Sequence, residues 1–419
     1  MSDTRPLARR LGTVDAVFIG LGSMIGAGVF AAFTPAAQAA GSGLLVGLLV
    51  AAVVAACNAL ASAQLAAAFP TSGGTYVYGR EQLGQWWGFL AGWSFVVGKT
   101  ASCAAMALAF ASYAAPAGWE RPVAAVAVVA LAAVNVRGIT RTAGTARVIV
   151  VLVLIALAIA VGAATTSPAF AAIDLSGVLA DGPYGILQSA GLLFFAFAGY
   201  ARVATLGEEV RHPERTIPRA IIIALSITVV VYGVIGVTLL SVLGSDGLAR
   251  TDAPVTAAAL ASGWDWVGPV TTVGAALASL GALLALIAGV SRTALAMARE
   301  GDLPRWLAAV HPRFAVPHRA EVTLAVVIVA LVLLLDLRAA IGFSSFGVLL
   351  YYLVANLSAL SQARDARRYP RALFVLGALG CAILVVTLPV ASIVGGLVVI
   401  AAGVVYRLVR TRWPVASGP

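Results

Sequence analysis

The chain has 419 residues, of which 61% are hydrophobic and 11% are charged, whereas water-soluble globular proteins carry roughly a quarter charged residues. This composition excludes a water-soluble enzyme and predicts a polytopic membrane protein. The formal net charge is +10, but the basic residues are scattered between apolar runs, so the charge does not indicate a nucleic-acid partner.

Stretches of about 20 mostly apolar residues are long enough to cross a bilayer as helices. Twelve such stretches predict an all-α polytopic membrane protein, and they cover 13–39, 43–68, 86–115, 122–136, 147–164, 183–207, 218–243, 267–297, 321–336, 339–360, 371–389 and 391–409. The polar segment 1–12 leads into the first stretch without a small-residue cleavage site. We therefore interpret that stretch as a spanning helix and not as a signal peptide.

Arginines are distributed unequally between the two sides that alternating spans define. Lys99 is the only lysine among the 27 basic residues. Of the arginines, only Arg121, Arg250 and Arg338 fall on the side opposite the N-terminus. The positive-inside rule therefore predicts a multi-pass protein of the cell inner membrane with both termini in the cytoplasm.

Two of the predicted spans are interrupted. The first contains GLGSMIGAGVF (Gly20–Phe30), and the sixth contains FFAFAGYA (Phe194–Ala201). Because the breaks lie five spans apart, and five is odd, the second set of spans must enter the membrane from the opposite side. This arrangement predicts a five-plus-five inverted repeat, two further helices and a cytoplasmic tail, which cover 13–164, 183–360, 371–409 and 410–419.

Helix breaks expose backbone groups that can bind a small charged molecule. Several glycines within two turns weaken a helix and free its amides and carbonyls. Amides at a half-helix N-terminus favour a carboxylate, and freed carbonyls of the sixth span can accept hydrogen bonds from an ammonium group. Two facing breaks therefore predict a receptor for a zwitterion. The alternative is that these glycines only allow close helix packing.

Four motifs, in this order, resemble those of the amino acid-polyamine-organocation (APC) transporters: GSMIGAGVF (Gly22–Phe30), PTSGGTYVYGREQLG (Pro70–Gly84), FFAFAGYARVATLGEEVRHPERTIPRAI (Phe194–Ile221) and SRTALAMAREGDLP (Ser291–Pro304). The resemblance covers nearly the whole chain. It implies a LeuT-like fold of 12 helices with helices 1 and 6 broken. It also implies transport of amino acids or related amines by alternating access.

The resemblance further implies which residues surround the substrate. The residues it places near the substrate carboxylate are Met24, Gly26, Ala27 and Gly28, and the carbonyls it places near the amine belong to Phe195, Ala196 and Ala198. The Phe195 ring would cover the substrate as a gate. Ordinary packing of that ring is the alternative.

Lys99 lies near the middle of the third span. A charge at that depth costs several kcal/mol, so the side chain is expected to face the protein interior or a water-filled cavity. Three roles are open: a hydrogen bond to the substrate or to broken helix 1, a protonatable coupling group, or a structural cation between helices 1 and 8. Some APC relatives carry a lysine in helix 5, which has none here, so Lys99 is a candidate substitute.

The residues after the second break bear on the substrate. Many relatives place an acidic residue there, where this chain has Gly199, Tyr200, Ala201 and Arg202. This departure disfavours a strongly cationic substrate. Together with Lys99 it favours a neutral or acidic amino acid.

Glu208 and Glu209 follow the sixth span within a cluster of charged residues. Such a cluster is usually a solvated face. The alternative is an inner gate in which these carboxylates pair with Arg80 or with arginines of the eighth span. Asp15, in the first span, is expected to pair with a loop arginine and not to bind substrate.

Proton symport is the predicted mechanism, with amino acid exchange as the second choice. The sequence lacks the Walker A pattern GxxxxGK[ST], so it does not indicate direct use of ATP. A channel would need a continuous polar stripe, and an enzyme a mid-membrane histidine or paired carboxylates. A membrane nutrient sensor that binds without transporting stays open, as do the oligomeric state and the substrate. Three cysteines within apolar segments and three histidines predict no metal site or cofactor.

Overall fold

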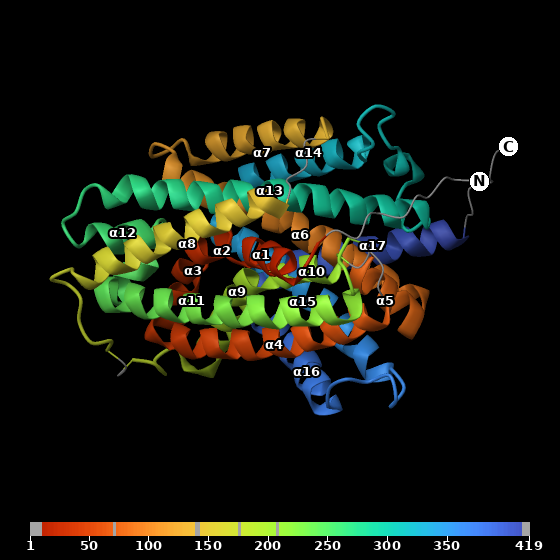
Figure 1. The fold of residues 1–419 in the computed structure, drawn as a ribbon, viewed down its shortest axis with the longest axis horizontal. Coiled ribbons are helices and arrows are strands. Elements are labelled where there is room, and N and C mark those ends of the chain that lie inside the picture. Colours follow the sequence, from red (N-terminus) through yellow and green to blue (C-terminus); the bar gives the residue numbers. More distant parts are fainter. Residues whose placement is uncertain (1–10, 70–72, 139–142, 175–176, 207–208, 413–419) are drawn as a thin grey trace.

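The computed structural model describes residues 11–69, 73–138, 143–174, 177–206 and 209–412 as a bundle of helices (Figure 1). The α-helices are α1 (Thr13–Met24), α2 (Ala27–Ala31), α3 (Phe33–Ala40), α4 (Leu44–Ala68), α5 (Gly74–Leu83), α6 (Gln85–Ala114), α7 (Glu120–Val136), α8 (Ala143–Thr165), α9 (Gly182–Phe197), α10 (Ala201–Ala204), α11 (Pro213–Arg250), α12 (Pro254–Leu260), α13 (Val267–Arg299), α14 (His318–Leu334), α15 (Leu337–Ser361), α16 (Arg371–Thr387) and α17 (Val390–Arg412). Three short 3₁₀ turns join some of them: η1 (Gly41–Gly43), η2 (Ala198–Tyr200) and η3 (Arg305–Ala308).

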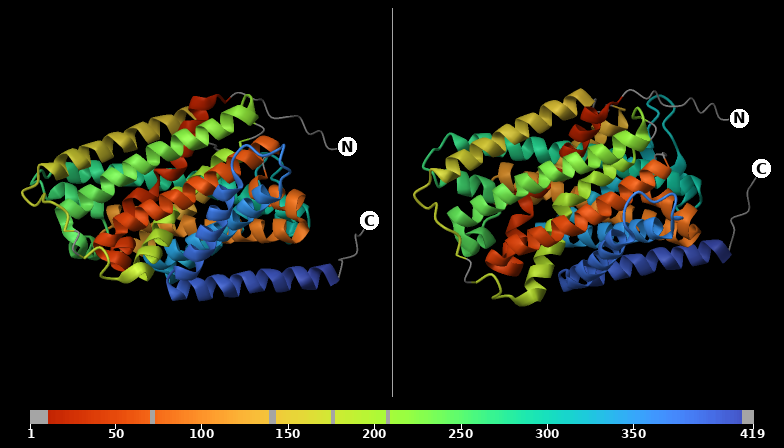
Figure 2. Two further views of the ribbon diagram at one scale, coloured as in Figure 1. Left: turned by 90° about the horizontal axis from the view of Figure 1, so that it is seen from below. Right: turned by 60° about the horizontal axis from the view of Figure 1, so that its bottom comes forward.

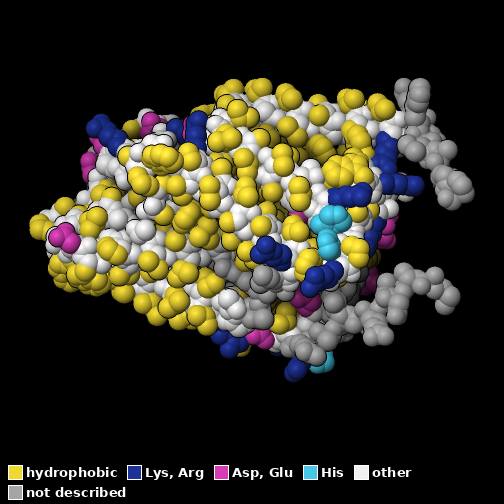
Figure 3. Space-filling model, turned by 90° about the horizontal axis from the view of Figure 1, so that it is seen from above, with side chains coloured by type: hydrophobic (Ala, Val, Ile, Leu, Met, Phe, Trp, Pro, Cys, Tyr) yellow, Lys and Arg dark blue, Asp and Glu magenta, His cyan; other side chains and the backbone are white. Residues whose placement is uncertain are grey.

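Apolar side chains cover the outside of this bundle. Leu49 and Val230, for example, are each 65% exposed, which water would penalise and lipid does not. Figure 3 shows apolar side chains across the middle of one face and charged side chains toward its ends. Within the described ranges, nine helical stretches are long and apolar enough to cross a membrane. The structure is therefore that of a multi-pass membrane protein.

Nine of the twelve predicted spans overlap these stretches, although the first ends at Ala31 and not at 39, and the second begins at Phe33 and not at 43. The remaining three, 122–136, 321–336 and 371–389, fall on α7, α14 and α16, each of which has 17 residues. At a rise of 1.5 Å per residue, 17 residues cover about 26 Å, slightly less than the hydrocarbon core of a typical bilayer. The prediction of twelve spans is neither confirmed nor excluded by helix length alone.

The interrupted helices lie inside the bundle. In an 18-residue apolar segment of each stretch, 67% of Thr13–Ala31 and 78% of Gly182–Ala204 is buried. The corresponding share for Val390–Arg410 is 22%. Figure 2 accordingly shows α17 along the outer edge of the bundle, while Figure 1 shows α1, α2, α9 and α10 near its middle. The predicted binding stretches are thus enclosed by the other helices.

Close packing of α6 against α15 fixes the position of Lys99. A Cβ atom added to Gly347 would lie 2.7 Å from the Cα atom of Gly98, so the two backbones are almost in contact. Such small-residue contacts replace the hydrophobic driving force that helices lack in lipid. The next residue after Gly98 is Lys99, which α6 thereby holds at a fixed depth in the interior.

Candidate substrate site

The first predicted break is a real opening of the helix. α1 ends at Met24, and α2 begins at Ala27. Between them Ile25 has ψ 56° and Gly26 has φ −103° and ψ −139°, which are not helical angles. A Cβ atom on Gly26 would lie 2.9 Å from the Cβ atom of Ala282 in α13. The tight fit against α13 therefore favours glycine at the opening.

The second predicted break is milder. α9 ends at Phe197, η2 runs from Ala198 to Tyr200, and α10 begins at Ala201. Ala198 has φ −67° and ψ 4°, and Tyr200 has φ −64° and ψ −20°, close to the angles of a 3₁₀ turn. The helix tightens here and does not unwind, because all of these residues keep right-handed backbone angles.

The two breaks touch each other. A Cβ atom on Gly28 would lie 2.6 Å from the Cα atom of Ala196, and one on Gly199 would lie 2.1 Å from the carbonyl oxygen of Ser23. Real Cβ atoms do not approach other heavy atoms so closely, so both glycines are required by contact between the two backbones. Stretches 170 residues apart in sequence therefore meet inside the bundle.

Two tyrosines bind the carbonyls at the breaks. The hydroxyl of Tyr232 in α11 lies 2.5 Å from the carbonyl oxygen of Met24 and 3.0 Å from that of Ala196. The hydroxyl of Tyr352 in α15 donates to the carbonyl of Ala198 at 3.3 Å. The sequence analysis missed both residues. A signal was present, because a tyrosine within an apolar span needs a partner for its hydroxyl.

Lys99 binds the second break. Its Nζ atom donates to the carbonyl oxygen of Ala198 at 3.0 Å, and the residue is only 6% exposed. Of the contacts left open for Lys99, the structure shows a different one, with the second break and not with helix 1. Within the described ranges, no carboxylate forms an ion pair with it. The lysine ammonium thus lies where the APC resemblance places a substrate amine.

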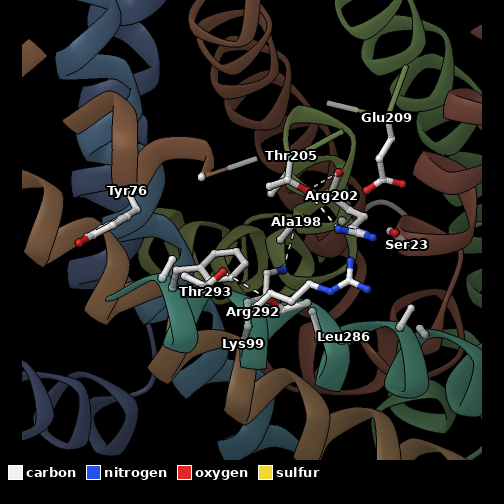
Figure 4. A pocket seen from close by; sticks show the side chains of 18 of the residues that line it. Ser23, Tyr76, Lys99, Ala198, Arg202, Thr205, Glu209, Leu286, Arg292 and Thr293 are labelled. Carbon is white, nitrogen blue, oxygen red and sulfur yellow. Dashed lines mark hydrogen bonds between the residues drawn. The ribbon is translucent and has the colours of Figure 1, made fainter. Parts of the chain in front are cut away.

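A cavity of about 670 Å³ adjoins this contact (Figure 4). Of the predicted site residues, Lys99, Ala198 and Glu209 line it. The other described ones do not: they are Met24, Gly26, Ala27, Gly28, Phe195 and Ala196, which are buried beside the cavity. Phe195 is 7% exposed, and its role as a gate stays a prediction.

The cavity wall contains charged residues that the sequence analysis did not assign to the site. Arg202 of α10 and Arg292 of α13 line the cavity together with Lys99 and Glu209. In Figure 4 the guanidinium groups of Arg202 and Arg292 point toward one another. Arg202 was noted only as a departure from the APC pattern. A basic residue one turn after a helix break was the signal that could have placed it here.

The inner gate at Glu208 and Glu209 stays a prediction. Glu208 lies outside the described residues, and Glu209 lines the cavity without an ion pair to a described residue. Arg80 was a candidate partner, but it pairs with Glu300 and Asp302 at 3.2 Å each. α5 packs against the segment that follows α13, which supplies these two carboxylates.

Asp302 is the centre of this other charged cluster. Besides Arg80, it accepts hydrogen bonds from the Tyr76 hydroxyl at 2.8 Å and from Arg407 of α17 at 2.5 Å. Burial, and then the hydrogen bond to Asp302, raise the pKa of Tyr76 above its usual value, so its hydroxyl keeps its proton. The guanidinium of Arg407 also lies over the ring of Phe89, 4.7 Å from the centroid. This cluster joins α5, α6 and α17.

Asp15 does not take part in the cavity. Its carboxylate forms an ion pair with Arg147 at 2.8 Å. The expected pairing with an arginine is therefore present, although Arg147 lies in α8 and not in a loop.

Comparisons with known proteins agree on a family. Residues 11–410 match the model of a family described as amino acid permease. An uncharacterized transporter of Mycobacterium tuberculosis is 58% identical over 406 residues, which cover 96% of this chain and 92% of that protein. A branched-chain amino acid permease of Bacillus subtilis is 27% identical, covering 76% and 73%. A chloroplastic cationic amino acid transporter of Arabidopsis thaliana is 28% identical, covering 84% and 65%.

Proposed function

This chain belongs to the amino acid permease family of the APC superfamily, and from that premise we propose that it is a proton-coupled symporter of neutral or acidic amino acids. Membrane transport is the activity that its family and relatives share. The observation that supports an amino acid site is the contact between two interrupted helices beside the cavity that holds Lys99. The proposal includes twelve spans in a LeuT-like five-plus-five repeat, with both termini in the cytoplasm.

The substrate would lie in the cavity beside the two breaks, where Ser23, Ala198 and Gly199 line the wall. The opening at Gly26 frees amides that suit a carboxylate, and neighbouring Met24, Ala27 and Gly28 would enclose it. Carbonyls of the second break, at Phe195, Ala196 and Ala198, would accept hydrogen bonds from the amine, which at Ala198 would replace the hydrogen bond from Lys99. The ring of Phe195, in α9, would cover the substrate.

Lys99 would couple transport to protons. A protonated lysine attracts the carboxylate of an amino acid across a cavity of low dielectric constant. By linkage, a bound carboxylate raises the proton affinity of Lys99 by the same factor by which the proton on Lys99 raises the affinity for the carboxylate. Substrate and proton therefore favour each other on the same side of the membrane, which is the requirement for symport. Exchange without net proton movement is the competing mechanism.

The structure would represent an inward-facing conformation. The cavity extends from Lys99 to Glu209 and Arg292, at the ends of helices that the arginine distribution assigns to the cytoplasm. Closing this path while opening the opposite one, by rocking one repeat against the other, would complete the cycle.

The test is uptake by the purified protein in liposomes. We expect an acid-outside pH gradient to drive accumulation of labelled amino acids. Lys99→Met should reduce this accumulation at least tenfold because it removes the coupling charge, while the melting temperature in detergent is retained or raised. Arg319→Gln, which removes an exposed positive charge outside the cavity, serves as the control. Wild-type accumulation by Lys99→Met would overturn the coupling role, and uptake insensitive to the gradient would favour exchange.

A further inference from the structure

The cavity has an excess of positive charge on its described wall. Lys99, Arg202 and Arg292 are basic, and Glu209 is the acidic residue among the described lining residues. The three basic groups come from three separate elements, α6, α10 and α13. They converge on one space, which Figure 4 shows. A convergence of like charges from separate elements is unfavourable unless a ligand, an acidic partner or water compensates it, and it gives the cavity a positive potential that attracts an anion.

Neither guanidinium group forms an ion pair with a carboxylate in the described part of the chain, although Glu209 interacts with Arg202 at longer range. Arg202 uses one Nη1 donor on the hydroxyl of Thr205 at 3.2 Å, out of five N–H groups. Arg292 is exposed and forms no hydrogen bond or ion pair with a described residue. Buried Glu321, whose carboxylate lies 3.5 Å from the Ser291 hydroxyl, interacts with it only at longer range and does not line the cavity. The fork of donors on each arginine matches the two oxygens of a carboxylate.

The position of Arg202 relative to Lys99 suggests the length of the ligand. Arg202 follows Ala198 by four residues, and Ala198 is the residue whose carbonyl binds Lys99. Four residues cover about 6–8 Å along the backbone, because part of this stretch is the 3₁₀ turn η2. A short dicarboxylic amino acid carries its two carboxylates at a separation of this order. One carboxylate can therefore lie near the breaks and Lys99 while the other reaches the arginines.

We propose that Arg202 and Arg292 form a second anion subsite, which binds the side-chain carboxylate of an acidic amino acid. This inference rests on the proposed function and narrows its substrate class. A neutral side chain would leave both guanidinium groups without an anion, and a cationic one would be repelled by them. Glu209, at the same wall, would limit binding of larger polyanions by like-charge repulsion.

Binding to the full-length protein in detergent tests the proposal. The probes are glutamate, aspartate, glutamine, lysine and inorganic phosphate, measured by competition against one labelled amino acid. We expect glutamate or aspartate to bind at least tenfold more tightly than glutamine or lysine. This measurement on the wild type needs no folded variant. Equal or tighter binding of glutamine or lysine would overturn the proposal.

Charge substitutions then locate the subsite. Arg202→Gln and Arg292→Gln should each weaken glutamate binding by about 10–100-fold and change glutamine binding little. Arg202→Lys and Arg292→Lys, which keep the charge but lose the fork, should retain part of the preference. Arg299→Gln is the matched control, because Arg299 is an exposed residue of the same helix as Arg292 and does not line the cavity.

Two other outcomes separate this inference from its premise. If phosphate competes with glutamate but a neutral amino acid binds undisturbed beside it, the arginines hold a free anion and the substrate assignment is wrong. If neutral amino acids are transported with full dependence on Lys99 and none on the arginines, the second subsite fails while the proposed function stands. If no amino acid binds or moves, the proposed function itself fails.

Discussion

The two helix interruptions differ in how they are made, although they meet at one place. At Ile25 and Gly26 the helix opens, with backbone angles far from helical. At Ala198–Tyr200 it only tightens into a 3₁₀ turn. The first stretch has glycine at 20, 22, 26 and 28, whereas the second has only Gly199. Glycine density in the sequence therefore governs which helix opens.

The second interruption depends on side chains from elsewhere in the fold. Its carbonyls at Ala196 and Ala198 accept hydrogen bonds from Tyr232, Lys99 and Tyr352, which lie in α11, α6 and α15. A 3₁₀ turn leaves carbonyl groups less well satisfied than an α-helix does, and these donors compensate in an interior without water. The first break is thus determined mainly by local sequence, and the second mainly by tertiary contacts.

The contact between the two breaks can be disrupted most strongly at Gly199. In Gly199→Ala the new Cβ atom would lie 2.1 Å from the carbonyl oxygen of Ser23 and 2.6 Å from the amide nitrogen of Met24. Both are backbone atoms that cannot rotate away, so we expect a cost at or beyond the roughly 1–3 kcal/mol typical of overpacking. A large fall in melting temperature and loss of uptake would show it.

Gly233→Ala is the matched control. Gly233 lies within α11, and a Cβ atom there would meet no other atom within 4 Å. Replacing a helical glycine by alanine in open space is favourable by up to about 1 kcal/mol. The two substitutions should therefore change stability in opposite directions. Equal stability of Gly199→Ala and the wild type would contradict the close approach of the two breaks.

Tyr232→Phe should have the next largest effect. The hydroxyl of Tyr232 bridges the carbonyls of Met24 and Ala196, one from each break. Losing a hydrogen bond to a buried carbonyl costs about 1–3 kcal/mol. We expect a lower melting temperature and weaker substrate binding, because the breaks are no longer tied to each other. Tyr184→Phe, on a 52% exposed tyrosine of α9, should change neither measurement.

Sequence patterns predicted the features that depend on local composition. Apolar runs located the helices, and Gly26 lies at the predicted opening. The burial of Lys99 followed from the cost of a charge in a membrane. The hydrogen-bond partner of Lys99, the carbonyl of Ala198, did not follow from the sequence, because it depends on how α6 packs in the bundle.

Partners that lie far apart in sequence were not predictable in the same way. The pairing of Arg80 with Asp302 depends on how α5 lies against the segment after α13. Arg202 and Arg292 meet across the cavity because α10 and α13 face each other there. Charge patterns identify such residues as unusual. The spacing of residues along the chain does not predict that two side chains 90 residues apart will lie on the same cavity wall.

Tyr352→Phe should lower the melting temperature less than Gly199→Ala or Tyr232→Phe does. The size of this decrease measures how much the second break depends on Lys99. Tyr352 donates to the carbonyl of Ala198 at 3.3 Å, but that oxygen keeps its hydrogen bond from Lys99 at 3.0 Å. A neutral hydrogen bond of this kind contributes about 0.5–1.5 kcal/mol. We expect a small fall in melting temperature in the wild-type background and a larger one in Lys99→Met, where the carbonyl would lose both donors. Equal falls in the two backgrounds would mean that the two donors act independently, and the second break would then be held by its own backbone and not by these side chains.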